Sequence, residues 1–234
     1  MEANALMTPA SARDQILARI RAANALAASS AAAFAAADID AAYRAIPRDY
    51  LAAHHSQDIV ALFAERTADY RAIVERVPAS DVAAAVARAL PGDGRYVVPD
   101  GFPAQWRPAA GVGSAGVGSA GVGIAGDDPP LSPAALDAMT GVITGCAVAI
   151  AETGTIILDH GPGQGRRALT LVPDFHLVIV RADQVEPDLA GAFGRLDPAR
   201  PHTLISGPSA TSDIELIRVE GVHGPRTLHV LLVG

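Results

Sequence analysis

The chain has 234 residues, half of them hydrophobic, and a formal net charge of −7. This apolar content is sufficient for a buried core, which excludes an intrinsically disordered protein. An acidic chain without runs of Lys or Arg is also a poor partner for nucleic acid, because binding the phosphate backbone needs clustered cations.

The apolar stretches are too short for a membrane-spanning helix. The longest one, around Val142 to Ala151, includes Thr144 and Cys146 and falls well short of the roughly 20 residues that cross a bilayer. The N-terminus lacks the basic head and compact apolar core of a signal peptide. We therefore expect a soluble protein of the cytoplasm.

A single cysteine, Cys146, excludes an intrachain disulfide. It also excludes an iron–sulfur cluster held by this chain, because such clusters generally take several thiolates. The apolar neighbours of Cys146 favour a buried, unreactive thiol over a nucleophile. No His-x-x-x-His pair lies on a predicted helix, and the side chains of the adjacent His54 and His55 would diverge. We expect no metal site and no cofactor held by this chain.

Residues 1–90 are predicted to form a helical region that packs on the core. The first part is rich in Ala, the residue with the highest helix propensity, and the later parts show apolar residues at helical spacing. The expected helices cover residues 9–28, with an extension toward residue 37, then residues 57–77 and residues 80–90.

Residues 111–125 consist of three tandem pentapeptides, Gly-Val-Gly-Ser-Ala twice and then Gly-Val-Gly-Ile-Ala. The period is too short for a solenoid, and ordering so much glycine costs entropy. We interpret residues 108–130 as a flexible surface insertion. A phosphate-cradling glycine loop is the alternative, but such loops usually lead into a helix through a Lys or a capping hydroxyl. Here two aspartates and two prolines follow.

Residues 91–234 contain short apolar runs that alternate with helix signals. These runs are nearly continuous in Val, Ile and Leu, a pattern typical of strands buried on both faces. We therefore predict an α/β domain with a mostly parallel sheet covered by helices. Strands are expected at residues 96–98, 141–144, 155–158, 168–172, 177–180, 203–205 and 228–233, and helices at residues 185–196 and after residue 209.

Three glycine-containing segments lie near the ends of these predicted strands, and the first is Ala151 to Thr155. A glycine between two threonines, Thr153 and Thr155, permits a tight turn that aims amide and hydroxyl donors at an oxyanion, and Glu152 adds a base or an acceptor. The alternative is an ordinary β-turn with a solvated Glu152.

The second segment runs from Ser206 to Glu215 and the third from Glu220 to Arg226. Serine and threonine hydroxyls in the second segment would cap a helix whose free amides attract an anion, although Asp213 and Glu215 would repel one. An ordinary capped helix is the alternative. In the third segment, His223 stands between two glycines, which favours an acid–base or hydrogen-bonding role over a core histidine.

Four ordered stretches also carry a family resemblance: residues 151–155, 171–176, 206–215 and 221–226. Together they resemble successive signatures of the lactate-utilisation (LUD) family. Trp106 and Asp137 also match family positions, whereas the N-terminal helices match only loosely. The resemblance implies a fold similar to the NagB/RpiA/CoA-transferase group, here with an N-terminal helical extension.

The resemblance further implies an accessory component, without an iron–sulfur cluster, that acts beside iron–sulfur subunits in oxidising L-lactate to pyruvate. The alternative is a small-molecule enzyme or binding protein for a phosphorylated or CoA-linked ligand. The family pattern fixes no catalytic residue, so it leaves open whether this chain is itself an enzyme.

The turns near Thr153, Pro208 and His223 are expected to converge on one cleft at an edge of the sheet, where an anionic small molecule could bind. The catalytic candidates are Glu152, Glu215 and His223, and the ligand-binding candidates are Thr153, Gly154, Thr155, Gly207, Pro208, Ser209, Thr211, Asp213 and Gly224.

Overall fold

The computed structural model describes residues 12–30, 36–48, 58–92, 94–108, 122–211, 219–220 and 224–234. The chain divides into two compact units, Met1–Tyr50 and Leu51–Gly234. In the first unit lie two helices, α1 (Ala12–Ser30) and α2 (Ala36–Ala45). Both fall in the part of the chain where helix propensity is highest. No helix in the described ranges is long and apolar enough to cross a membrane.

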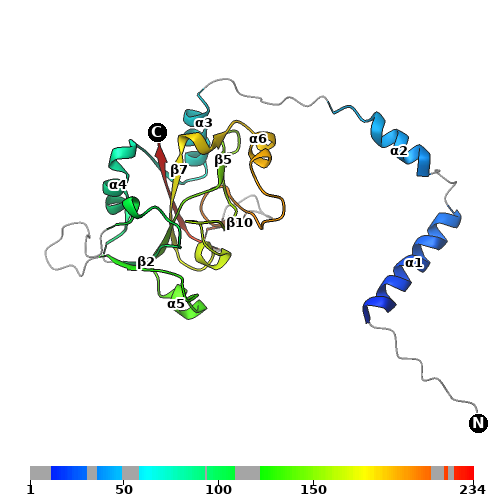
Figure 1. Ribbon diagram of the computed structural model, residues 1–234, viewed down its shortest axis with the longest axis horizontal. Coiled ribbons are helices and arrows are strands. Elements are labelled where there is room, and N and C mark those ends of the chain that lie inside the picture. Colours follow the sequence, from blue (N-terminus) through cyan, green and yellow to red (C-terminus); the bar gives the residue numbers. More distant parts are fainter. Residues whose placement is uncertain are drawn as a thin grey trace, which may run out of the picture. The chain divides into compact units, whose positions relative to one another are not determined.

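The second unit is built around a six-stranded sheet in which every neighbouring pair of strands is parallel. Its central strands, β7 and β12, pair over seven residues, and the other strands flank them (Figure 1). In spatial order the strands are β1 (Ile73–Val77), β12 (Thr227–Val233), β7 (Phe175–Arg181), β4 (Gly141–Thr144), β2 (Arg95–Val97) and β3 (Gly123–Ala125).

A smaller sheet of four strands is mostly antiparallel. Strands β5 (Val148–Ile150) and β6 (Thr155–Leu158) form a hairpin, which β8 (Val185–Glu186) and β9 (Thr203–Ile205) flank. A separate ladder pairs β10 (Ala210–Thr211) with β11 (Val219–Glu220). The remaining elements are short and connect or cover the strands. They are α3 (Ile59–Asp69), η1 (Ala79–Asp81), α4 (Val82–Ala89), η2 (Ala104–Trp106), α5 (Pro133–Asp137), η3 (Arg167–Thr170), η4 (Ala182–Gln184) and α6 (Leu189–Gly194).

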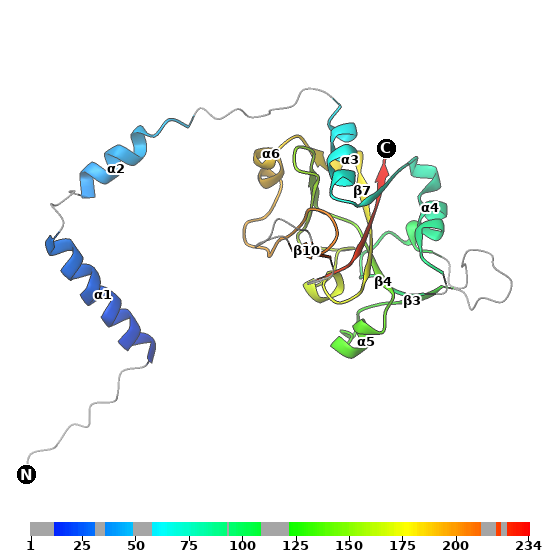
Figure 2. The ribbon, with the colours of Figure 1, turned by 180° about the vertical axis from the view of Figure 1, so that it is seen from behind.

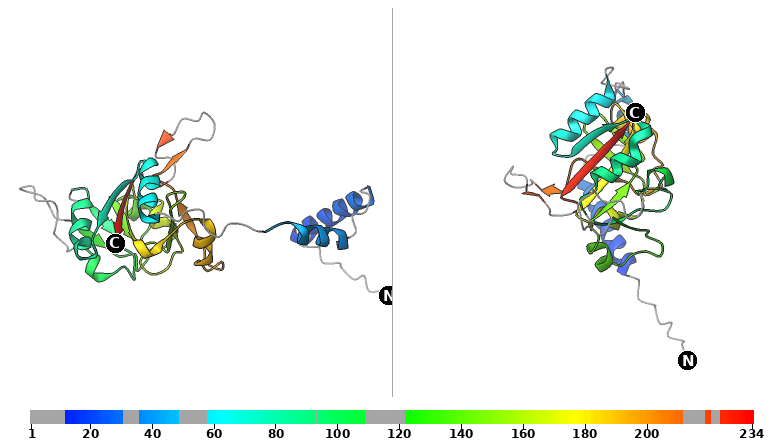
Figure 3. Two further views of the ribbon diagram at one scale, coloured as in Figure 1. Left: turned by 90° about the horizontal axis from the view of Figure 1, so that it is seen from above. Right: turned by 90° about the vertical axis from the view of Figure 1, so that its left-hand side faces the viewer.

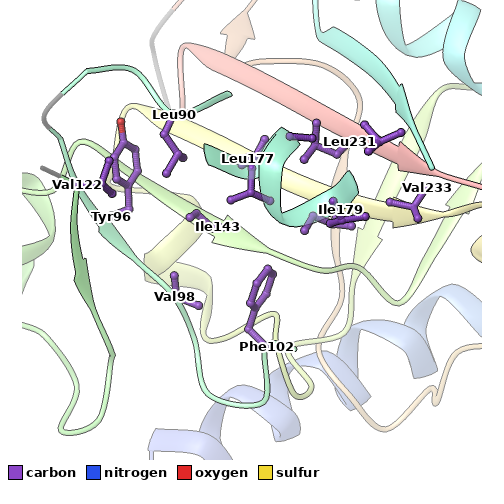
Figure 4. Packing of buried hydrophobic residues seen from close by; sticks show 14 of the residues in the cluster. Leu90, Tyr96, Val98, Phe102, Val122, Ile143, Leu177, Ile179, Leu231 and Val233 are labelled. Carbon is purple, nitrogen blue, oxygen red and sulfur yellow. The ribbon is translucent and has the colours of Figure 1, made fainter. Parts of the chain in front are cut away.

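One face of the large sheet is covered by α4, whose residues Val82, Ala85 and Val86 are fully buried at i, i+3, i+4 spacing. They pack with Leu177 and Leu231 from the central strands. Figure 4 shows the sheet side of this core, with side chains from β2, β4, β7 and β12 gathered in one cluster.

The opposite face is covered by α3 and the smaller sheet. Phe63 of α3 and Ile156 of β6 pack there with Val178 and Val230 from the central strands. Figures 2 and 3 show α3 and α4 on opposite sides of the central strands. The predicted α/β fold with a mostly parallel, helix-covered sheet is thus confirmed, and it explains why the central strands are apolar at successive positions.

The predicted helix over residues 57–77 is wrong in its second half. Helix α3 ends at Asp69, Arg71 adopts a positive φ of 69°, and Ile73–Val77 form β1. Pairing with β12 orders this segment as a strand, because tertiary hydrogen bonds override a short amphipathic pattern. Elements α3, β1 and α4 lie in the unit Leu51–Gly234 together with the other strands.

Other predictions also need correction. Residues 168–172, predicted as a strand, overlap the 3-10 helix η3, and residues 185–196, predicted as one helix, form β8 and the short α6. A strand, β10, follows Ser209 where a helix was expected. The last pentapeptide repeat supplies β3, which pairs with β2, so this part of the proposed flexible insertion is an edge strand. Residues 109–121 of that insertion lie outside the described ranges.

Candidate functional site

The first predicted segment forms the turn of the β5–β6 hairpin and packs against α3. The backbone of Gly154 has a φ of +58°, and a Cβ at this position would lie 2.7 Å from the carbonyl carbon of Arg66. The Thr67 hydroxyl donates to the carbonyl of Gly154 at 3.4 Å. Glu152 is exposed, and its amide donates to the carbonyl of Pro187 at 3.1 Å. Glycine is therefore needed here for a close backbone approach.

A short chain of hydroxyl groups links this turn to the second predicted segment. The hydroxyls of Thr153 and Thr155 share a hydrogen bond of 2.7 Å, and those of Thr155 and Ser206 share one of 2.8 Å. Thr155 is buried. Because Ser206 directly follows β9, the pairing of β6 with β9 is what brings these hydroxyls together.

The second and third predicted segments also meet. The amide of Ser209 donates to the carbonyl of Pro225 at 2.8 Å, and Gly224 has a φ of +110°. Of the other candidates here, Gly207 and Pro208 precede Ser209 in the same bend, and Thr211 lies in β10. Asp213, Glu215 and His223 lie outside the described residues. The first segment thus contacts the second, and the second contacts the third. Their convergence on one common cleft stays a prediction.

A cleft of about 540 Å³, which we name the Asp100 cleft, opens at the carboxyl ends of β2 and β3. Asp100 follows β2, and Asp127 follows β3. Open parallel sheets bind ligands at this edge, so its position is that of a ligand site. The lining residues are Pro99, Asp100, Gly101, Asp127, His160, Gly161, Pro162, Gly165, Arg166 and Leu169.

One wall of the Asp100 cleft is the loop that follows β6, and side-chain hydrogen bonds fix its shape. The Asp159 carboxylate accepts hydrogen bonds from the amide of Gly161 at 3.1 Å and from the side chain of Gln164 at 2.7 Å. His160 has a φ of +57°, and its Nδ1 lies 2.9 Å from the carbonyl of Gly165. Since a carbonyl only accepts, Nδ1 carries a proton. The loop is therefore preorganised.

One arginine–aspartate pair lines the Asp100 cleft, and a second holds the loop that forms its wall. Arg166 donates from Nε to Asp127 Oδ2 at 2.7 Å and from Nη2 to Asp127 Oδ1 at 3.0 Å, a bidentate pair. Burial alone would raise the pKa of Asp127, but hydrogen bonds from Arg166 and Leu131 and the arginine charge outweigh it and lower that pKa. Asp159 is likewise paired with Arg200, whose Nη1 lies 3.0 Å from Asp159 Oδ2.

This loop is not among the glycine-containing segments predicted from the sequence. The available signal was the run of Gly161, Gly163 and Gly165 at alternate positions, which begins three residues after a correctly predicted strand and leads into Arg166. The contribution of Asp100 and Asp127 had no local signal, because the sheet brings these residues to the loop from the ends of other strands.

A second cleft of about 470 Å³ lies at the amino ends of β4, β7 and β12. Arg226 and Asp174 form a bidentate ion pair there, with Arg226 Nε 2.6 Å from Asp174 Oδ1, and this hydrogen bond lowers the pKa of Asp174. Of the predicted ligand-binding residues, Gly224 lines this cleft. The other lining residues are Asp137, Met139, Leu171 and Val172.

Two buried polar side chains, Thr144 and His176, lie on the neighbouring strands β4 and β7 of the large sheet. The Thr144 hydroxyl and His176 Nε2 are 2.8 Å apart, and burial, aided by the charge of Arg167, lowers the pKa of His176 to about 3. Burial raises the pKa of Cys146 to about 12, so this residue is a protonated, unreactive thiol at neutral pH. Within the described ranges, no group of three or more His, Cys, Asp or Glu side chains is placed to hold a metal ion.

Comparisons with known proteins agree with this fold. The model of the LUD domain family matches residues 21–233. Lactate utilization protein C of Deinococcus radiodurans is 49% identical over 181 residues, which cover 76% of this chain and 80% of the relative. The protein of that name from Bacillus pumilus is 37% identical over 92 residues, which are 36% of this chain and 38% of the relative.

Among solved structures, the crystal structure of a DUF162 family protein from Deinococcus radiodurans superposes with a TM-score of 0.60 and 42% sequence identity. The match covers 76% of this chain and 97% of that one. The family model, the relative and the solved structure each match most of the chain, so this protein belongs to the LUD domain family.

Proposed function

We propose that the protein is an accessory component of a cytoplasmic system that oxidises L-lactate to pyruvate. The observation that carries this proposal is the 49% identity, over most of both chains, to a relative named lactate utilization protein C. Shorter matches to proteins of the same name in Bacillus pumilus and Halalkalibacterium halodurans support the same assignment.

The chemistry of the reaction suggests how the work is divided between subunits. Oxidation of lactate to pyruvate releases two electrons and two protons, so it needs an electron acceptor. Cys146 is the single cysteine, and it is a buried thiol, so this chain cannot supply the set of thiolates that iron–sulfur clusters generally require. In this proposal, iron–sulfur partner subunits carry the electrons, and this chain supports them by binding a partner, a ligand or both.

Growth on L-lactate tests the proposal. A strain that lacks the gene, and has no paralogue of it, is expected to grow on pyruvate but not on L-lactate, and the intact gene is expected to restore growth. Growth on pyruvate controls for general defects. Unimpaired growth of the deletion strain on L-lactate would remove the proposed role.

The partnership is tested separately by purification from lactate-grown cells. A tagged chain is expected to retain subunits that bring iron and acid-labile sulfide in equal amounts, with visible absorbance that bleaches on reduction. A chain purified alone from an otherwise normal strain would contradict a stable complex with iron–sulfur subunits.

Glu152, Glu215 and His223 remain candidate catalytic residues in this proposal. Complementation with Glu152→Gln provides a direct test, because Glu152 is exposed in the hairpin turn and the amide preserves its size. Loss of growth on L-lactate, with normal protein levels, would support a chemical role for this carboxylate. Full growth would leave Glu152 as an ordinary residue of a β-turn.

A further inference from the structure

We propose that the Asp100 cleft binds a small organic molecule that brings hydrogen-bond donors, either an ammonium group or a pair of hydroxyls, to the carboxylate of Asp100. We further propose that phosphorylated and carboxylate ligands are disfavoured there. This inference goes beyond the role in lactate oxidation and does not rest on it.

The cleft has the features of a built binding site. It combines polar groups with the exposed apolar surface of Pro162, and its volume of about 540 Å³ suits a small organic molecule. The loop that forms one wall is held by hydrogen bonds and packs closely. A Cβ at Gly165, for example, would lie 2.5 Å from Leu169 Cδ1. Such a preformed wall binds without a large ordering cost.

The charges of the cleft decide which ligands it accepts. Two aspartates and one arginine line it, which leaves a formal charge of −1 when His160 is neutral. Arg166 is already occupied, because it donates twice to Asp127 and once to the carbonyl of Leu131 at 2.7 Å. The nearby Arg200 is paired with Asp159. These arginines therefore have their charges offset before any ligand arrives.

Asp100 is the group that remains available. It is exposed, and its carboxylate has no hydrogen bond or ion pair with the residues that the structure describes. Its backbone carbonyl accepts from the amide of Gly163 at 2.7 Å, which fixes the main chain at this residue. An ionised carboxylate accepts hydrogen bonds and cannot donate, so its natural partner is an ammonium group or a pair of hydroxyls. A phosphate would meet an unpaired negative charge.

Matched probes distinguish these ligand classes. Binding is followed by the amide NMR signals of Gly101, Gly163 and Leu169 in the 234-residue chain. The first series is adenosine, 2′-deoxyadenosine and adenosine 5′-monophosphate, and the second is tryptamine and indole-3-propionic acid. We expect adenosine, tryptamine or both to shift these signals, and we expect the anionic member of the same series to bind about 10-fold more weakly or worse.

Comparison of the probes shows whether the ligand donates from hydroxyls or from an ammonium group. Weaker binding of 2′-deoxyadenosine than of adenosine identifies the hydroxyl pair as the donor. Binding of tryptamine with no preference between the two nucleosides identifies the ammonium group. If no probe shifts the signals of the cleft, or if the anionic probes bind as tightly as their partners, the proposal is wrong.

Two substitutions provide the matched controls. Asp100→Asn keeps the size of the side chain and removes its charge, and it is expected to weaken the preferred probe about 10-fold or more. Asp69→Asn makes the same charge change on the exposed end of α3, outside the cleft, and is expected to leave binding unchanged. Equal binding by wild type and Asp100→Asn would overturn the assignment, and the comparison of probes on the wild-type protein does not depend on either variant.

Discussion

At the level of single residues, His176 shows how burial fixes a protonation state. Its side chain is 1% exposed and lies 2.8 Å from the Thr144 hydroxyl of the neighbouring strand β4. Burial lowers the pKa of His176 to about 3, far below the ordinary value of 6.5. The ring is therefore neutral in the folded protein under physiological conditions, whereas the same residue titrates normally in the unfolded chain.

This difference predicts a pH dependence of stability. At pH values between the folded pKa of about 3 and the unfolded value of 6.5, His176 binds a proton in the unfolded chain but not in the folded one. The free energy of unfolding therefore falls as the pH drops through this window and is highest above it. His176→Gln removes the titrating group. Between about pH 4.5 and 6, it should reduce the slope of that free energy against pH by the amount that corresponds to the uptake of about one proton on unfolding.

Urea unfolding at several pH values measures both slopes. The pKa of His229 is also lowered by burial, so it adds a slope of the same sign in wild type and variant alike. The lowered pKa values of Asp127 and Asp174 affect stability below their ordinary value of 3.8, outside the range of about pH 4.5 to 6 in which the slopes are compared. Identical slopes for wild type and His176→Gln would show that His176 does not have a depressed pKa.

At the level of elements, the β5–β6 hairpin depends on the glycine of its turn. The Ala151 amide donates a hydrogen bond to the backbone carbonyl of Glu186 in β8. Gly154 lies close to the backbone of Arg66 and Thr67 in α3. The turn thus joins the small sheet to α3, the helix that covers the same face of the large sheet. Its hydroxyls then connect to the strand that leads into the predicted Ser206 segment.

Gly154→Ala is expected to destabilise the protein by about 1–3 kcal/mol, because alanine is strained at positive φ and its Cβ has no space beside α3. The control is Gly126→Ala, where no atom lies within 4 Å of the added Cβ. Denaturant unfolding compares the two variants. An equal, small effect of both substitutions would mean that the turn can move away from α3 without cost.

Elements also show where local sequence is a reliable guide. The predicted strands at residues 141–144, 155–158 and 203–205 coincide with β4, β6 and β9. Each is a short run of apolar, largely β-branched residues. Among the strands that were missed, β1, β3 and β5 have weaker local signals: β1 contains Glu75 and Arg76, β3 contains glycine, and β5 lies within a longer apolar stretch.

At the level of the whole unit of residues 51–234, stability depends on the strands that have a core on each face. Leu231 of β12 is fully buried in the core under α4, while its neighbours Val230 and Leu232 belong to the core on the other face. Leu204 of the edge strand β9 is 50% exposed. The same residue type therefore occupies two very different environments.

Leu231→Ala is expected to cost about 2–5 kcal/mol, since it leaves a cavity between the sheet and α4. Leu204→Ala should cost about 1 kcal/mol or less, because half of its surface is already in water. Thermal and urea unfolding of the 234-residue chain measure both changes. Similar losses for the two variants would contradict the burial of Leu231 between the large sheet and α4.

The sequence by itself determined the fold class, several strands and the family. Buried parallel strands leave continuous apolar runs in the sequence, and each family motif consists of residues that are close together along the chain. It also indicated that Cys146 is a buried thiol. Tertiary structure decided the rest. Residues 73–77 became a strand through pairing with β12, and the Asp100 cleft was assembled from Asp100, Asp127 and the loop after β6. These residues come together only when the strands take their positions in the sheet, and no short stretch of sequence specifies the order of the strands.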